Sequence, residues 1–131
     1  MRPHVENAPS LRTAWAAEVL SARAACRSID GAGEWSHLER AHILSQPLPA
    51  LHVRTHAAML GAAVRRRDRR EIVGQLFRLI VAAPGSFTGR YPIGNTGGAN
   101  VSAFAPMPIP EDLQPLLTAS GSAFDASPVE R

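Results

Sequence analysis

Apolar residues recur at helical spacing through the first two thirds of the chain. Four stretches, at about residues 10–28, 34–45, 49–67 and 68–83, place apolar side chains three or four positions apart, which puts them on one face of an α-helix. Short segments such as "DGAG" and "QPLP" separate the stretches, and glycine and proline commonly end helices. The pattern predicts an all-α fold in which four antiparallel helices form stacked hairpins, similar to tetratricopeptide units.

Each predicted helix has one face that we expect to be buried. Ser10 or Thr13 is expected to cap the first helix and Asp68 the fourth, which Pro84-Gly85 should end. The residues expected on the buried faces are Leu11, Trp15, Val19 and Leu20 in the first helix, Trp35, Leu38 and His42 in the second, Leu51, Thr55, Ala58, Met59 and Ala62 in the third, and Ile72, Leu76, Leu79 and Ile80 in the fourth.

Beyond residue 84 the helical pattern is lost. The stretch "GSFTGRYPIGNTGGANVSAFAPMPIP" is rich in glycine and proline and shows neither helical nor alternating periodicity. We expect residues 85–117 to form an ordered irregular arm packed on the helices, with a short helix at 110–117 that begins at Pro110. The helical domain then covers residues 10–84, between a flexible leader at 1–9 and a disordered tail at 118–131.

The composition indicates one small cytoplasmic domain. A chain of 131 residues, of which 45% are apolar, is long enough for one core and too short for two. The longest apolar run, residues 76–83, is interrupted by Arg78 and is far shorter than the roughly 20 residues of a membrane span. The amino terminus lacks the apolar segment of a signal peptide, and the single Cys26 suits a reducing compartment. We therefore expect no membrane segment.

All fourteen basic residues are arginine and the net charge is +3. Five of them lie in "RRRDRRE", at Arg65, Arg66, Arg67, Arg69 and Arg70. This cluster is either a partner-binding surface or a solvated turn in which arginine stabilises a helix C-terminus. Asp68 and Glu71 lie within it and no aromatic residue interleaves to stack on bases, which disfavours nucleic acid. A protein partner or a homodimer remains as an expectation.

The candidate chemistry lies in "HLERAHILSQPLPALHVRTH", residues 37–56, which holds four of the five histidines. Glu39 and His42 are three positions apart, and His52 and His56 are four apart, so each pair shares a helix face. A hairpin that turns near Pro47 places His42 level with His52, and Glu39 level with His56. One carboxylate and three imidazoles suit a divalent ion of zinc, iron, nickel or copper.

Two acidic residues could extend this ligand set. Glu18 on the first helix and Glu71 on the fourth could complete a carboxylate-rich site like that of di-iron helix bundles. The alternative is a polar seam without metal, in which Glu39 pairs with a histidine or with Arg40. "GNTGG" has neither the spacing nor the lysine of a phosphate-binding loop. No residue is assigned as catalytic, and a binding role is favoured over an enzymatic one.

Four stretches carry a resemblance to a known family. "HLERAH", "EIVGQLFRLIVAAPGS", "TGRYPIGNTGG" and "PMPIPEDL" resemble a small bacterial family of domains of unknown function, over most of residues 12–117. No activity is established for that family, so the resemblance implies no catalytic residue. Its members are similar to proteins encoded near heavy-metal resistance genes, which favours a role in metal homeostasis or resistance. The competing hypothesis is a metal-free module that binds another protein on its stacked hairpins.

Overall fold

The computed structural model describes residues 9–88, 93–102 and 105–121, without the side chains of residues 81–88. Within these residues the only regular elements are helices, and the all-α class predicted from the sequence is confirmed. The helices are α1 (Leu11–Arg27), α2 (Gly31–Ser45), α3 (Pro49–Arg66), α4 (Arg69–Thr88) and α5 (Gln114–Ala119). The expected leader and most of the expected tail lie outside the described residues.

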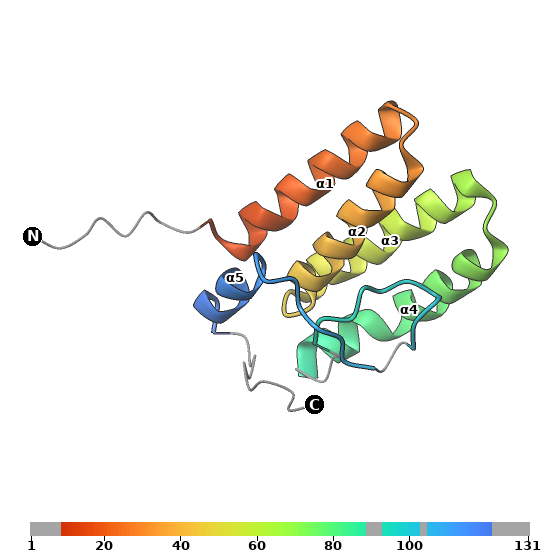
Figure 1. The fold of residues 1–131 in the computed structure, drawn as a ribbon. Helices are drawn as coiled ribbons and strands as arrows, with labels where there is room; N and C mark the ends of the chain where they lie inside the picture. Colours follow the sequence, from red (N-terminus) through yellow and green to blue (C-terminus); the bar gives the residue numbers. More distant parts are fainter. Residues whose placement is uncertain (1–8, 89–92, 103–104, 122–131) are drawn as a thin grey trace, which may run out of the picture.

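From α1 to α4, successive helices pack side by side and run in alternate directions (Figure 1). Polar side chains fix where α1, α2 and α4 begin, because each accepts a bond from a main-chain N–H that the first turn leaves unpaired. Ser10 accepts from the N–H of Thr13 at 3.2 Å. Asp30 and Asp68 do the same for α2 and α4, at 2.9 and 3.0 Å. The short turns that join α1 to α2, α2 to α3 and α3 to α4 leave room only for antiparallel neighbours.

Three helix boundaries differ from the sequence-based prediction. Because Asp30 caps it, α2 begins at Gly31 rather than near Glu34. Helix α4 continues to Thr88, since the only bond that Pro84 removes lies near the end of the helix, where its loss costs least. The short C-terminal helix begins at Gln114 instead of Pro110, because residues 110–113 form a turn in which the N–H of Leu113 bonds the carbonyl of Pro110.

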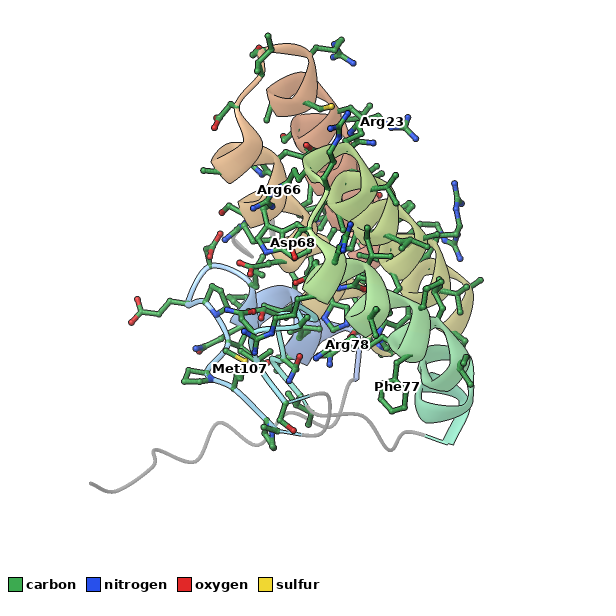
Figure 2. The ribbon with its side chains drawn as sticks, turned by 90° about the vertical axis from the view of Figure 1, so that its right-hand side faces the viewer. Arg23, Arg66, Asp68, Phe77, Arg78 and Met107 are labelled. Atoms are coloured by element: carbon green, nitrogen blue, oxygen red, sulfur yellow. The ribbon has the colours of Figure 1, made fainter. Side chains whose placement is uncertain are left out.

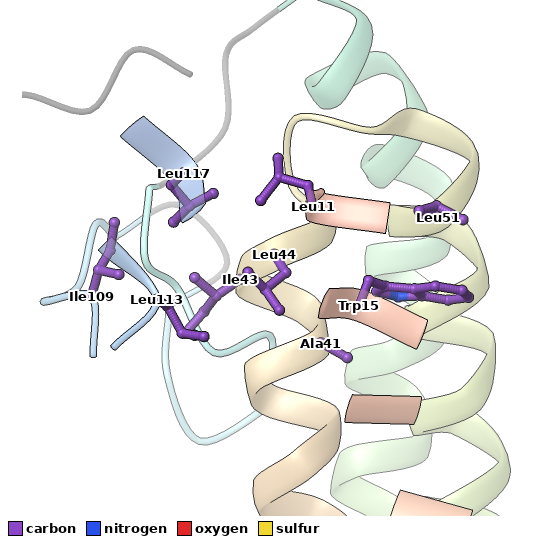
Figure 3. Packing of buried hydrophobic residues seen from close by; sticks show 9 residues of the cluster. All are labelled: Leu11, Trp15, Ala41, Ile43, Leu44, Leu51, Ile109, Leu113 and Leu117. Atoms are coloured by element: carbon purple, nitrogen blue, oxygen red, sulfur yellow. The ribbon is translucent and has the colours of Figure 1, made fainter. Parts of the chain in front are cut away.

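The larger hydrophobic core joins the helical hairpins to the end of the arm. Figure 3 shows Ile109, Leu113 and Leu117 facing the helix residues of this cluster. The helix residues are Leu11, Trp15, Ala41, Ile43, Leu44 and Leu51. Burying side chains of this size stabilises the fold by roughly 1.5–3 kcal/mol each. The arm therefore forms part of the core.

Helix α4 is oriented opposite to the prediction. Its polar residues Glu71, Gln75 and Arg78 are 8%, 0% and 6% exposed, whereas Leu76 and Ile80, both expected in the core, are 50% and 75% exposed. Ile72 and Leu79, which were also expected in the core, are only partly buried. An apolar stripe normally faces the core, but here the arm and His56 of α3 offer polar groups that the polar face of α4 bonds. Leu20 of α1, which was also expected in the core, is 62% exposed.

In the described part of the chain, no helix combines the length and the apolar character that crossing a bilayer requires.

Candidate metal centre

Three buried imidazoles meet between α2 and α3. The Nε2 atom of His42 lies 3.0 Å from the Nε2 atom of His56 and 3.0 Å from that of His52. The third side of the triangle, from His52 to His56, is 3.2 Å. All three side chains are at most 5% exposed. They form a group of side chains that could each offer one ligand atom to a single ion.

The chain positions these rings as the hairpin geometry predicts. His52 and His56 are one turn apart on α3 and therefore share a face. His42 belongs to the last turn of α2, and the short turn through Pro47 returns the chain so that its ring lies against both. Thr55, on the same face of α3, is held by its own bonds to Ser45 and to Trp15. Neighbouring polar contacts thus fix the relative position of the two helices.

The arm fixes the orientation of the His42 ring. Its Nδ1 atom lies 2.6 Å from the main-chain oxygen of Asn95. The Asn95 side chain in turn donates to the carbonyls of Ser102 and Ala105, both at 2.7 Å, and accepts from the N–H of Gly97. Gly97 has φ +83° and lies against the imidazole, so a Cβ there would come within 2.9 Å of three ring atoms of His42. The glycine is required both for its conformation and for this close approach.

Helix α4 fixes the orientation of the His56 ring. The Nδ1 atom of His56 lies 2.7 Å from Oε1 of Gln75. The Gln75 amide is itself held, because its Nε2 donates to Glu71 at 2.6 Å and to the carbonyl of Gly97 at 2.7 Å. Glu71 also accepts from the N–H of Ala99 through both carboxylate oxygens. A chain of hydrogen bonds therefore runs from the arm through α4 to the imidazole.

These bonds determine which ring nitrogens carry hydrogen. A carbonyl oxygen can only accept, so His42 and His56 each donate from Nδ1. A neutral imidazole holds one hydrogen, so both Nε2 atoms then present lone pairs, 3.0 Å apart. His52 can donate from its own Nε2 and relieve one contact, but the contact between His42 and His56 still joins two acceptors. A cation in the triangle would satisfy all three nitrogens.

A proton bound to one of the rings does not take the place of that cation near neutral pH. Burial lowers the pKa of His42 well below its usual value, and the neighbouring His56 and His52 lower it further. Burial also lowers the pKa of His56 to about 4, against the raising effect of Gln75, and the charge of Arg78 adds to the lowering. His42 and His56 are therefore neutral at physiological pH, which is the form that binds a metal ion.

Glu39, the fourth ligand predicted from the sequence, does not join this group. Its Oε1 atom accepts from Nε1 of Trp35 at 3.0 Å. Burial raises the pKa of this carboxyl, and the charge of Glu71 raises it further, while the bond from Trp35 lowers it. Glu39 lies one turn before His42 on α2, and its carboxyl group bonds Trp35 instead of facing the three rings.

Neither Glu18 nor Glu71, the two additional acidic candidates, joins the triangle of His42, His52 and His56. Glu71 is one step removed, because it holds the Gln75 amide. Glu18 lies on the other side of α2, where it accepts from Nε of Arg40 at 2.8 Å and pairs with Nδ1 of His37 at 2.7 Å. Arg40 also bonds Asp112. We call these four residues, Glu18, His37, Arg40 and Asp112, the outer cluster.

The arginine-rich segment is divided among several roles. Arg65 pairs with the buried Glu34, and the Arg66 guanidinium lies over the ring of Trp35, 5.4 Å from its centre. Arg67 ends α3 in a left-handed conformation with φ 55°. Arg69 and Arg70 are exposed in the first turn of α4. Arg65 and Arg66 thus contribute to the fold as well as to the surface charge.

A groove of about 490 Å³ lies between α1, α2 and α3. Its floor includes the buried side chains of Ala22 and Leu38. Three exposed arginines, Arg23, Arg27 and Arg65, also line it. The volume is within the range of small-ligand pockets, and the charges of the exposed arginines suit an acidic occupant.

Comparison with protein families identifies the chain. A family model described as "Protein of unknown function (DUF3703)" matches residues 9–117. The chain belongs to this family. The matched range includes α1 to α4, the whole histidine triangle and the arm that bonds His42. Comparisons with curated proteins and with solved structures find no significant match.

Sequence reasoning missed the residues that surround the triangle. Gln75 and Arg78 follow Glu71 at four and seven positions, which is a polar stripe at helical spacing. That stripe was a usable signal for a polar face in contact with the histidines. The role of Asn95 was harder to predict from the sequence, because its contact with His42 uses a main-chain oxygen, an atom that every residue has.

Proposed function

We propose that this protein binds a divalent transition metal ion through His42, His52 and His56. The observation that carries the proposal is the contact of two lone-pair nitrogens, Nε2 of His42 and Nε2 of His56, at 3.0 Å in a buried site. Nitrogens bound to one ion at about 2.1 Å are about 3.0 Å apart at right angles and about 3.4 Å apart at a tetrahedral angle. The three separations in the triangle, 3.0, 3.0 and 3.2 Å, fall within that range.

The surroundings of the triangle also resemble those of metal sites. Metal-binding histidines usually donate from their second ring nitrogen to a carbonyl or carboxylate, which fixes the tautomer. His42 and His56 do so to Asn95 and Gln75. Three imidazoles suit zinc, copper, iron or nickel and leave further positions for water or a small ligand. Binding for storage, transfer or sensing, in metal homeostasis or resistance, requires no more than this set.

The test is elemental analysis of protein purified without a histidine tag, together with zinc titration of the metal-free protein. We expect about one ion per chain, lost in His42→Ala and in His56→Ala. The matched control is His37→Ala, which removes the histidine of the outer cluster and should leave binding intact. Circular dichroism checks that each variant is folded. Folded wild-type protein that binds no zinc, cobalt, nickel or copper in titration would overturn the proposal.

The groove supports a second candidate function, a module that binds an acidic protein segment. It rests on the three exposed arginines around the groove. Fluorescence titration with a glutamate-rich helical peptide tests it. We expect Arg23→Glu to weaken binding at least tenfold and the control Arg12→Glu, at the far end of α1, to have little effect. If the two variants weakened peptide binding equally, the interaction would depend only on the net charge of the protein.

A further inference from the structure

Helix α4 carries an exposed apolar stripe on the side that does not contact the histidines. Val73, Leu76 and Ile80 are 67%, 50% and 75% exposed, and their spacing of three and seven positions places them on one helix face. Figure 2 shows the buried Arg78 directed toward the arm, where it donates to the carbonyl of Val101 at 2.7 Å. We call Val73, Leu76 and Ile80 the α4 stripe.

We propose that the α4 stripe is the contact surface of a homodimer, in which α4 of a second copy packs against it in antiparallel orientation. A helix whose buried face is polar and whose exposed face is apolar is unfavourable in an isolated monomer, because water covers the wrong side. Covering the stripe removes an apolar area on the order of 300 Å² per copy, the size of patch that is often functional.

The stripe is complementary to itself when the second helix runs in the opposite direction. A two-fold axis near Leu76 places Val73 of one copy beside Ile80 of the other, and Ile80 beside Val73. The two copies of Leu76 then meet at the axis. One surface thus supplies both sides of the contact, which a different partner would have to match by its own sequence.

The charges of α4 also select the antiparallel arrangement. Arg69 and Arg70 lie in its first turn, and the last ten residues of the helix, 79–88, contain no charged side chain. In an antiparallel pair these arginines lie along the carboxyl end of the other helix, where its dipole is negative. A parallel pair would bring the arginines of the two copies together, at a cost from like-charge repulsion.

The contact is small, so the dimer should depend on concentration. Two stripes bury on the order of 600 Å², well below the roughly 1,600 Å² of a standard interface. We expect a dissociation constant on the order of 10–100 µM. Sedimentation of the metal-free protein over a range of concentrations should show the mass rising from 14.0 kDa toward twice that value. The measurement does not depend on the proposed metal binding.

Two variants give the specific test. Ile80→Glu should keep the protein monomeric at every concentration, because it places two carboxylates in the apolar contact. Leu20→Glu alters an apolar side chain of α1 that is 62% exposed, and should dimerise as the wild type does. A wild type that stays monomeric overturns the proposal and leaves the stripe to another segment or another protein. A dimer that survives Ile80→Glu also overturns it, because the contact then lies elsewhere.

Disulfide trapping tests the orientation in a Cys26→Ser background. Leu76→Cys should form a covalent dimer on oxidation with diamide, which introduces no metal ion. Val73→Cys alone should not, whereas a mixture of Val73→Cys and Ile80→Cys proteins should cross-link, because facing α-carbons must lie within about 7 Å. Efficient cross-linking of Val73→Cys to itself would overturn the antiparallel arrangement.

Discussion

Helix α2 carries a cluster of hydrogen-bonded polar side chains on each of two sides, and the clusters differ in how their groups are matched. On the outer side, Glu18 accepts from both Arg40 and His37, and Arg40 also bonds Asp112. Every contact joins a donor to an acceptor, and opposite charges meet. On the inner side, the Nε2 atoms of His42, His52 and His56 contact one another. Like groups meet there, in a buried position.

This difference separates the proposed metal site from a purely structural network. Each cluster contains histidine and lies near carboxylates, so composition alone does not separate them. The outer cluster is complete as it stands, because each of its acceptors faces a donor and its distal carboxylate is largely in water. In the inner cluster the Nε2 atoms of His42 and His56 both present lone pairs, and the bonds to Asn95 and Gln75 hold these two rings in place. A buried contact between two acceptors is unfavourable, and the proposed metal ion would relieve it.

The largest predicted effect comes from removing one corner of the triangle. Zinc at about a thousand times its dissociation constant should stabilise the wild type by about 4 kcal/mol, because the ion binds only the folded state. His42→Ala should remove this gain. Thermal unfolding with and without zinc measures it. His37→Ala, in the outer cluster, should retain the full gain, and a loss in both variants would erase the distinction between the clusters.

The second prediction uses acid to disturb the inner cluster without metal. The pKa of His56 is about 4 in the folded protein against 6.5 for the ordinary side chain, so the unfolded chain takes up its proton first as the pH falls. Stability should therefore be full above about pH 6.5 and should decline by about 3 kcal/mol as the pH approaches about 4. Urea unfolding of metal-free protein across this range measures it.

The outer cluster should contribute little to that decline. The hydrogen bond from Arg40 lowers the pKa of Asp112, so this carboxylate stays charged over the range and its contribution is lost only at lower pH. His56→Ala should therefore flatten the curve between pH 6.5 and 4. If His37→Ala flattened it instead, the acid sensitivity would belong to the outer side of α2.

The third prediction concerns the support of the triangle. Gln75→Leu removes the acceptor of the His56 Nδ1 hydrogen while keeping the volume nearly unchanged. Because such supporting bonds set ligand orientation, metal affinity should fall by about 10- to 100-fold. Competition titration with a chelator measures the change. Gln114→Leu is the control, because that amide bonds the carbonyl of Ile109 at the far end of the arm, and it should leave the affinity within about twofold.

The physical origin of each feature explains whether it could be predicted from the sequence. Local signals predicted the ends of α1 and α3, since caps and prolines act within a few residues. Counting residues back from the turn at Pro47 also predicted that His42 would meet His52, because hairpin depth depends only on chain length. The burial of α4 was wrong, because the apolar stripe of Leu76 and Ile80 is stronger locally than the polar stripe. The polar stripe faces inward only because the arm and the histidines bond it.

The smallest predicted effect lies in the outer cluster. Asp112→Asn removes the charge that bonds Arg40, but this side chain is 64% exposed and solvent screens the pair. The free energy of unfolding should fall by at most about 0.5 kcal/mol, and the small loss should diminish further in high salt. Urea unfolding at low and at high ionic strength measures both.

Since α5 is held to the helices mainly by Leu113 and Leu117, the variant should keep its core. A loss of several kcal/mol, with release of α5, would show that charge rather than apolar packing holds this end of the arm, and the outer cluster would then be essential to the fold.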